Sequence, residues 1–246
     1  MNETFEISDK DIQELTDISV KYSKIISDVI TEAQKNIVGQ EDVIKKIVIS
    51  IISGGHALLE SVPGLAKTLM IKTMADIFSV NNVRIQFTPD LLPADILGTK
   101  IYKNNSETFE IQKGPIFHNF ILADEINRAP PKVQSALLES MQEKQVSIHG
   151  ETFQLNKPFL VLATQNPIEN EGTYKLPEAQ VDRFALKIKI DYPTKDQEIK
   201  IIKRNTSNIE IKINPIVKSK EILEMQRFNE KIYADNVILK FHSFLW

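Results

Sequence analysis

The segment that most constrains the fold is residues 57–71. An apolar run at its start is followed by a loop around Gly64, and then by a helix-like stretch that begins with Lys67 and Thr68. A short apolar run bounded by turn residues is typical of a buried strand. The segment therefore predicts a strand, a loop and a helix, with Lys67 and Thr68 in the first helical turn.

Further apolar runs repeat this pattern at 83–87, 120–123 and 159–163. Such runs, separated by helix-like segments, predict an α/β fold with buried parallel strands and helical crossovers. Between the last two runs, 146–155 alternates around a His-Gly turn and predicts a hairpin. The clearest helix begins at Pro131 and should pack on the sheet through one apolar face, made of Val133, Ala136, Leu137 and Met141.

Helical patterns flank this region on both sides. Apolar spacing predicts one or two amphipathic helices in 9–36 and another helix at 41–53. Thr194 and Gln197 form a capping-box pattern that begins a helix, and a last helix is expected at 219–232. We expect three units: a helical lead-in at 1–36, an α/β core at 37–192 and a partial helical domain at 193–246.

The loop before Lys67 and Thr68 suits a phosphate group. Backbone N–H groups at a helix N-terminus carry partial positive charge, a lysine there neutralises phosphates, and a threonine hydroxyl reaches Mg²⁺. The loop departs from the common glycine pattern, because Ser61 and Ala66 stand at the two glycine positions. The plain alternative is an ordinary strand-to-helix turn with a surface lysine.

Two carboxylates, Asp124 and Glu125, follow one of the apolar runs. At the carboxyl edge of a parallel sheet, Asp124 would join the Mg²⁺ shell and Glu125 would orient the attacking water at the γ-phosphate. The alternative is a solvated acid pair at a strand end.

Asn166 follows the next run and would hydrogen-bond the same water or the γ-phosphate. Alone, it would read as a turn asparagine before Pro167.

The composition excludes several classes of protein. The chain is 42% hydrophobic and 26% charged, as in ordinary folded soluble proteins, and its net charge of −3 argues against nucleic acid as a partner. It has no cysteine, so disulfides and thiolate metal sites are excluded. The N-terminus lacks the pattern of a secretion signal, and no apolar run is long enough to span a bilayer. We expect a cytoplasmic protein.

Four longer motifs occur in order: LLESVPGLAKT at 58–68, QFTPDLLPAD at 86–95, LADEINRAPP at 122–131 and LPEAQVDRF at 176–184. Together they resemble the MoxR family of AAA+ ATPases, in the helix-2-insert clade that is related to the ATPase subunits of magnesium chelatase. The resemblance implies a P-loop NTPase fold, in which a three-layer parallel sheet forms the AAA+ core and is followed by a partial C-terminal helical lid.

The resemblance also implies ATP and Mg²⁺ as cofactors. It assigns nucleotide binding to Val38, Gly39, Pro63, Gly64, Leu65, Ala66, Lys67, Thr68, Leu69 and Asp124. Thr68 and Asp124 would hold the metal, and the catalytic residues would be Glu125, Asn166 as sensor 1, and Arg183. Near the adenine, Tyr22 or Ile37 remain alternatives to Val38 and Gly39.

Arg183 matches the arginine that family members project into a neighbouring subunit's site, where it stabilises charge on the transferring phosphoryl group. Its alternative is an internal ion pair with Asp182 or Glu178. Arg128 is also expected at the subunit boundary. The resemblance thus implies a homo-oligomeric ring, a hexamer, in which hydrolysis needs the neighbouring copy.

Protein clients are implied in the same way, among them proteins with von Willebrand A domains. Residues 88–113 resemble the helix-2 insert and 146–155 the hairpin of this clade, and both are expected to contact substrates or partners. We expect an ATPase that remodels or activates proteins in a chaperone-like way.

Two other functions stay open. One is an ATP-binding switch with little turnover, because Ser61 replaces a glycine that is usual in the family, and the match fades near 238–240 before the lid's sensor-2 arginine. We therefore expect a C-terminally truncated chain. The other is a nucleic-acid motor, against which the lack of a basic stripe with stacking aromatics argues.

Overall fold

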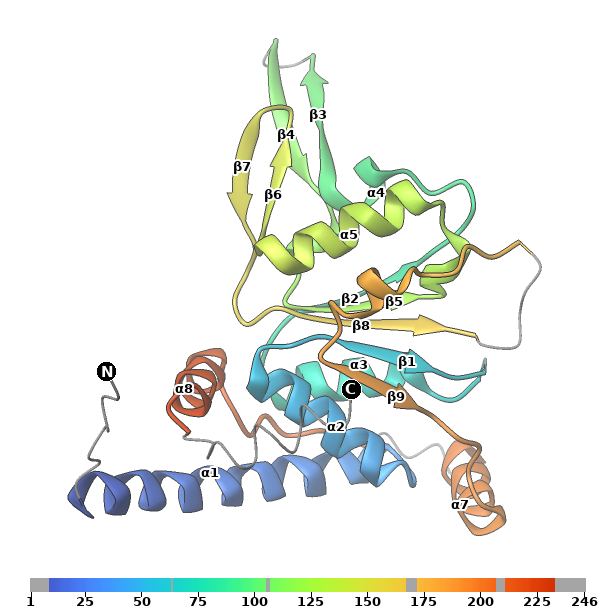
Figure 1. Ribbon diagram of the computed structural model, residues 1–246. Helices are drawn as coiled ribbons and strands as arrows, with labels where there is room; N and C mark the ends of the chain where they lie inside the picture. Colours follow the sequence, from blue (N-terminus) through green and yellow to red (C-terminus); the bar gives the residue numbers. More distant parts are fainter. Residues whose placement is uncertain (1–8, 63, 105–106, 167–171, 207–210, 233–246) are drawn as a thin grey trace.

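A computed structural model of the protein describes residues 9–62, 64–104, 107–166, 172–206 and 211–232. They form an α/β fold, in which a central sheet lies between layers of helices (Figure 1). In chain order the helices are α1 (Asp9–Asn36), α2 (Glu41–Ser53), α3 (Lys67–Ile77), α4 (Pro93–Leu97), the 3-10 turns η1 (Pro115–Phe117) and η2 (Ile126–Arg128), α5 (Pro131–Glu143), α6 (Glu178–Val181), α7 (Lys195–Thr206) and α8 (Ser219–Asn229). The strands are β1 (Ala57–Glu60), β2 (Asn82–Gln86), β3 (Gly98–Lys103), β4 (Thr108–Lys113), β5 (Phe120–Asp124), β6 (Gln145–Ile148), β7 (Glu151–Gln154), β8 (Leu160–Gln165) and β9 (Leu186–Lys189).

The central sheet has five parallel strands in the order β2-β5-β8-β1-β9. From β1 the chain moves towards the β2 edge, whereas from β8 it moves to the β9 edge, so β1 and β8 flank a topological switch point. Four of the strands confirm the predicted runs. No strand was expected at β9, because an edge strand needs little apolar surface: its sequence alternates with lysines and only Ile188 is buried.

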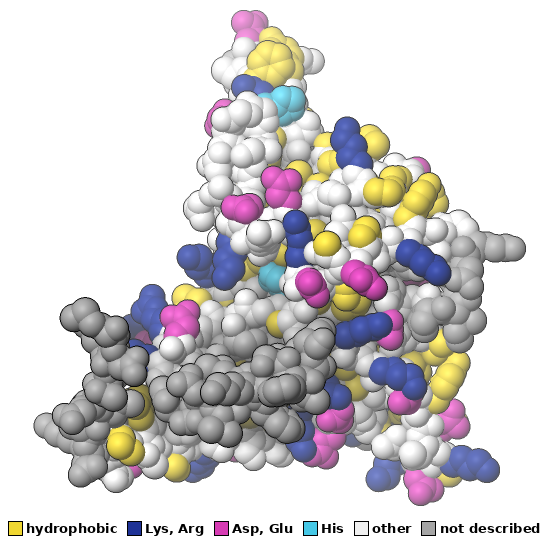
Figure 2. Space-filling view, in the orientation of Figure 1, with side chains coloured by type: hydrophobic (Ala, Val, Ile, Leu, Met, Phe, Trp, Pro, Cys, Tyr) yellow, Lys and Arg dark blue, Asp and Glu magenta, His cyan; other side chains and the backbone are white. Residues whose placement is uncertain are grey.

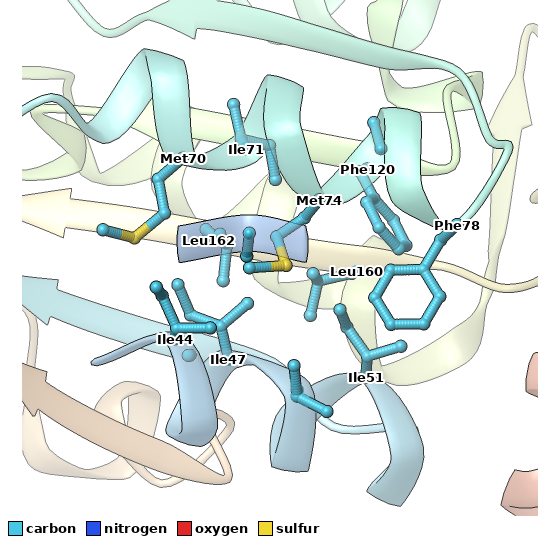
Figure 3. Close-up of a cluster of buried hydrophobic side chains, with 14 of the residues drawn as sticks. Ile44, Ile47, Ile51, Met70, Ile71, Met74, Phe78, Phe120, Leu160 and Leu162 are labelled. Atoms are coloured by element: carbon cyan, nitrogen blue, oxygen red, sulfur yellow. The ribbon is translucent and has the colours of Figure 1, made fainter. Parts of the chain in front are cut away.

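Side chains of the central strands alternate between two hydrophobic cores. Leu59 and Leu162 belong to the core shared with α2 and α3, while Leu58 and Val161 belong to the core shared with α5. Figure 3 shows α2, α3 and sheet side chains meeting in the first core. Because both faces of β1, β5 and β8 are covered, these strands are apolar up to their carboxyl ends, which is why the sequence predicts them.

The segment predicted as one or two N-terminal helices is one continuous helix, α1, of 28 residues. Val29 and Ala33 of α1 are buried in the core with α2 and α3. Glu32 is buried too, and it accepts hydrogen bonds from Lys35 at 2.6 Å and from the backbone N–H of Asn214 at 2.8 Å, which lower the pKa of its carboxyl group.

Within the described part of the chain, no helix combines the length and apolarity needed to cross a membrane.

The two C-terminal helices lie on opposite sides of the molecule (Figure 1). The predicted capping box at α7 is confirmed: the backbone N–H of Thr194 donates to Gln197 Oε1 at 2.9 Å, and that of Gln197 to Thr194 Oγ1 at 3.4 Å. Helix α8 packs on α2, where Gln226 Nε2 donates to the carbonyl of Ile51 at 2.7 Å. Residues 233–246 lie outside the described residues, and the division into three units stays a prediction.

Two antiparallel ribbons, β3–β4 and β6–β7, stand off one side of the molecule (Figure 1). The β6–β7 ribbon confirms the predicted hairpin, and positive φ angles at His149 (48°) and Gly150 (87°) match a type I′ turn. The β3–β4 ribbon was not expected. At its base, a Cβ on Gly98 would lie 2.3 Å from the carbonyl oxygen of Gln112, so only glycine fits there.

His56 is buried just before β1. Its Nδ1 accepts a hydrogen bond from the Val161 N–H at 3.0 Å, and its Nε2 lies 3.4 Å from the carbonyl oxygen of Met141. Burial lowers the pKa of His56 to about 4; the Met141 carbonyl raises it and the charge of Lys144 lowers it. The imidazole is therefore neutral, with its proton on Nε2.

We expect His56 to make the fold less stable as the pH falls from about 6.5 to about 4. Over this range the unfolded chain binds the proton and the folded chain does not, so the free energy of unfolding decreases with falling pH, by about 3 kcal/mol in total. His56→Asn should flatten this part of the stability profile, measured by urea unfolding at several pH values. A slope equal to that of the wild type would contradict the assignment.

Candidate functional site

The predicted phosphate loop joins β1 to α3 at the carboxyl edge of the sheet. Gly64 (φ 86°) and Ala66 (φ 52°) take left-handed conformations, and α3 begins directly after them at Lys67. The first backbone N–H groups of a helix have no partner within the helix, so this turn presents donors that suit an anion. Pro63, also predicted to bind nucleotide, lies outside the described residues.

A pocket of about 360 Å³ lies at this turn and brings most of the predicted site together. Its lining consists of Gly64, Leu65, Ala66, Lys67, Thr68, Arg84, Asp124 and Glu125. The loop and the acid pair, separated by more than fifty positions in sequence, therefore face one cavity. Neither Asn166 nor Arg183 lines it, and Arg84 is a member that was not predicted.

A second pocket, of about 240 Å³, shares Gly64, Leu65 and Ala66 with the first. Its other lining residues are Asn36, Ile37, Val38, Gln40, Leu69, Met70, Pro193, Ile201 and Arg204. This largely apolar surface suits a flat aromatic base. Gly39 lines an adjoining cavity together with Val38. Tyr22 instead packs edge-to-face on Phe228, so of the two alternatives only Ile37 reaches the pocket.

Lys67 is folded back onto its own loop. Its Nζ donates to Ser61 Oγ at 2.9 Å and to the carbonyl of Val62 at 3.1 Å. Burial lowers the pKa of Lys67, whereas the nearby charges of Asp124 and Glu125 raise it. The buried Ser61 hydroxyl, which replaces a glycine, thus holds the amine that is expected to meet phosphate.

Asp124 ends β5 and is only 6% exposed. Its Oδ1 accepts a hydrogen bond from Thr164 Oγ1 at 2.6 Å. Its Oδ2 accepts two from the guanidinium of Arg84, at 2.6 Å from Nη2 and 3.0 Å from Nε. A buried carboxylate needs such compensation, and here three donors from two neighbouring strands supply it.

Glu125 follows Asp124 in a left-handed conformation, with φ of 59°. Its backbone N–H donates to Thr164 Oγ1 at 2.8 Å. Its Oε2 accepts from Gln86 Nε2 at 2.8 Å and lies 3.1 Å from Arg128 Nε. Arg128, expected at a subunit boundary, therefore pairs with a carboxylate of its own chain.

Arg84, Gln86 and Thr164 also belong to the site, although they were not predicted as site residues. Arg84 Nη2 also donates to Gln86 Oε1 at 2.5 Å, so a chain of hydrogen bonds runs from Asp124 to Glu125. Arg84 and Gln86 are two positions apart on β2, which pairs with β5. Polar residues with a period of two at a strand end were the available signal, but the sequence does not say that β2 and β5 are neighbours.

Asn166 and Arg183, the remaining predicted residues, lie at opposite edges of the central sheet. Asn166 directly follows β8, whose neighbours are β5 and β1. Arg183 lies in the turn before β9 and is exposed. Among the described residues it makes no ion pair with Asp182 or Glu178, and its role stays a prediction.

The donors fit a Mg²⁺ ion that arrives with phosphates. Hydroxyl and carboxylate oxygens, as on Thr68 and Asp124, are the ligands that Mg²⁺ prefers. The described residues contain no group of three or more His, Asp or Glu that could hold a metal ion. Two protein ligands leave most of an octahedral shell to phosphate and water, which is the usual arrangement in nucleotide sites.

Comparisons with known proteins agree with this geometry. The family described as "ATPase family associated with various cellular activities (AAA)" matches residues 56–186. Chaperone MoxR1 of Mycobacterium tuberculosis is 56% identical over 175 residues, which are 71% of this chain and 46% of that protein. The uncharacterized protein YeaC of Bacillus subtilis is 43% identical over 205 residues, 83% of this chain and 64% of that one.

A solved crystal structure from Cytophaga hutchinsonii superposes with a TM-score of 0.85 at 49% identity, over 94% of this chain and 70% of that one. The chain spans about half to two thirds of the length of these curated relatives. The family match covers more than half of the chain and includes the loop and the acid pair. The chain belongs to the MoxR family of AAA+ ATPases.

Proposed function

We propose that this protein binds Mg·ATP in the two joined pockets, hydrolyses it, and uses the energy to remodel or activate protein partners. One observation carries the proposal: Lys67, Thr68, Asp124 and Glu125 line a single pocket, and an apolar pocket shares Gly64, Leu65 and Ala66 with it. A relative at 56% identity is named a chaperone, which supports the protein-directed role.

Each residue then has a task. Lys67 leaves Ser61 to neutralise phosphate oxygens, while Thr68 and Asp124 offer oxygen ligands to Mg²⁺, which supplies positive charge beside the phosphates when bound. The Glu125 carboxylate orients the attacking water and accepts its proton, and the Asn166 amide hydrogen-bonds the water or the γ-phosphate.

The purified chain should bind ATP with Mg²⁺ and release phosphate. Lys67→Ala should sharply weaken binding, because it removes the cation that the loop contributes to the pocket and leaves Arg84 as the other cation among the lining residues. Glu125→Gln should keep ATP bound and reduce turnover by about 10²–10⁴-fold, the usual effect of losing a general base. Equilibrium binding of a fluorescent ATP analogue and a phosphate-release assay check the two effects separately.

Unchanged turnover in Glu125→Gln would remove the assignment of the base. Binding without turnover in the wild type would instead favour the second candidate, an ATP-binding switch. The contact between Lys67 and Ser61 is the observation that favours it, because it lowers the availability of the lysine.

The Ser61 hydroxyl should weaken ATP binding. Ser61→Ala removes the hydrogen bond to Lys67 and keeps the Cβ, so we expect the dissociation constant for ATP to fall by about 2-fold to 13-fold, since one such bond contributes about 0.5–1.5 kcal/mol. Ser61→Gly should show at least the same gain. Equal or weaker binding in Ser61→Ala would mean that the contact supports the loop instead.

We also propose that the active form is a ring, a hexamer by resemblance, in which Arg183 of one subunit completes the site of the next. The support is that Arg183 is exposed and does not line the pocket of its own chain. Arg183→Ala should reduce turnover by about 10³-fold or more while ATP still binds.

Mixing two inactive variants tests this arrangement directly. Subunits with Arg183→Ala retain Glu125, and subunits with Glu125→Gln retain Arg183, so mixed rings should regain phosphate release that neither variant shows alone. A mixture as inactive as its components, under conditions where the two co-assemble, would place the role of Arg183 within one chain.

Client contact is proposed for the β3–β4 ribbon. Tyr102 and Phe109 are 51% and 64% exposed at its outer end, with ring centroids 5.1 Å apart, and hydrophobic side chains are visible there at the top of Figure 2. An exposed aromatic pair on a projecting ribbon suits apolar segments of a protein client. Proteins with von Willebrand A domains are the class that the family resemblance suggests.

A further inference from the structure

Arg84 lines the pocket that also holds Lys67, Asp124 and Glu125, but it belongs neither to the loop before α3 nor to the acid pair. It comes from β2, lines the pocket beside Lys67, and gives two hydrogen bonds to Oδ2 of Asp124. Its only other hydrogen bond within the described residues goes to Gln86. The positive charge closest to the proposed metal ligand is thus an arginine of the same chain.

This pairing balances a buried charge. The Asp124 side chain is 9% exposed, and a carboxylate in such surroundings is costly unless a cation compensates it. The Arg84 side chain, by contrast, is 47% exposed, so moving its guanidinium away would not open the core. The carboxylate is buried, whereas the guanidinium is accessible to solvent.

A metal ion at Asp124 conflicts with this arrangement. Mg²⁺ binds carboxylate oxygen at about 2.0–2.1 Å with strict octahedral geometry. Oδ1 is already bonded to Thr164 and Oδ2 to two guanidinium nitrogens, so an ion at Oδ2 would face an arginine charge bound to the same atom. Either the ion stays away or the guanidinium leaves.

Phosphate gives the guanidinium a new partner in the same pocket. Arginine binds phosphate oxygens with paired hydrogen bonds, and the pocket that Arg84 lines is the one built for phosphates. A bound triphosphate brings both the metal and the anion that would draw Arg84 away from Asp124.

We infer that Arg84 is a positioning residue that acts as the resident counter-ion of Asp124 before nucleotide binds, and that Mg·ATP exchanges it for Mg²⁺ while the guanidinium moves to the phosphates. The inference rests on the proposed function. It makes metal binding at Asp124 dependent on the nucleotide, because the competing charge leaves only when phosphate is present.

The test is the ratio of two dissociation constants for a fluorescent ATP analogue, measured in EDTA and in Mg²⁺. Arg84→Gln keeps a hydrogen-bond donor but removes the charge. It should weaken binding in EDTA and strengthen the contribution of Mg²⁺, so the ratio should rise by about tenfold or more over the wild type. If Arg84 has a purely structural role, Arg84→Gln should raise both dissociation constants by the same factor and leave their ratio unchanged. That result would overturn the inference.

Matched variants isolate the cause. Lys187 pairs with Glu60 at 2.7 Å across neighbouring strands of the same sheet but does not line the pocket, so Lys187→Gln removes an equal charge and should leave the ratio unchanged. Arg84→Lys keeps the charge and should stay within about twofold of the wild-type ratio, given that the competition is electrostatic. If Arg84→Lys instead shows a ratio as high as that of Arg84→Gln, the competition between Arg84 and Mg²⁺ is not electrostatic.

A measurement on the wild type needs no variant. Mg²⁺ without nucleotide should leave the melting temperature of the wild type unchanged, because the guanidinium of Arg84 is already hydrogen-bonded to Asp124. A rise in melting temperature would overturn the inference. Failure of the wild type to bind the ATP analogue would overturn the proposed function itself. Binding with an unchanged ratio in Arg84→Gln would leave the proposed function intact and remove only the exchange.

Discussion

The buried carboxylate of Asp124 is the constraint on which the site depends. It ends β5, and its partners come from the strands on either side: Arg84 from β2 and Thr164 from β8. The same Thr164 hydroxyl accepts the N–H of Glu125, so one side chain positions both acids. Three adjacent strands must therefore end at the same level for the charge to be compensated. The parallel register of the sheet provides this, which makes the sheet part of the site as well as its support.

Much of this could be predicted from the sequence, and the part that could not has a physical cause. Strands covered on both faces are apolar throughout, and loop, cap and hairpin residues have specific backbone tasks, so these elements were found. Edge strand β9 needs one buried residue, Ile188, and leaves almost no trace. Arg84 and Gln86 could not be predicted as site residues, because their role depends on β2 lying beside β5. Local sequence patterns do not predict which strands are neighbours.

The apolar pocket is built from three distant parts of the chain. Val38 comes from the turn after α1, Leu65 from the phosphate loop, and Ile201 from α7. A ligand held between them would bridge the N-terminal helices, the sheet and the first C-terminal helix. A ligand in this pocket would therefore contact α7 directly and would couple that helix to the loop, since α7 does not line the pocket of Asp124 and Glu125.

The β3–β4 ribbon has a mechanical consequence. It pairs only with itself, and at its base the Gly114 N–H donates to the Leu97 carbonyl at 3.1 Å while Lys113 lies over the rings of Phe117 and Phe153. Its outer half is therefore a lever anchored at one end. Lengthening or exchanging that half would change how far from the sheet the ribbon can contact another molecule, without disturbing the sheet itself. The length of the ribbon and the residues of the pocket can therefore change independently.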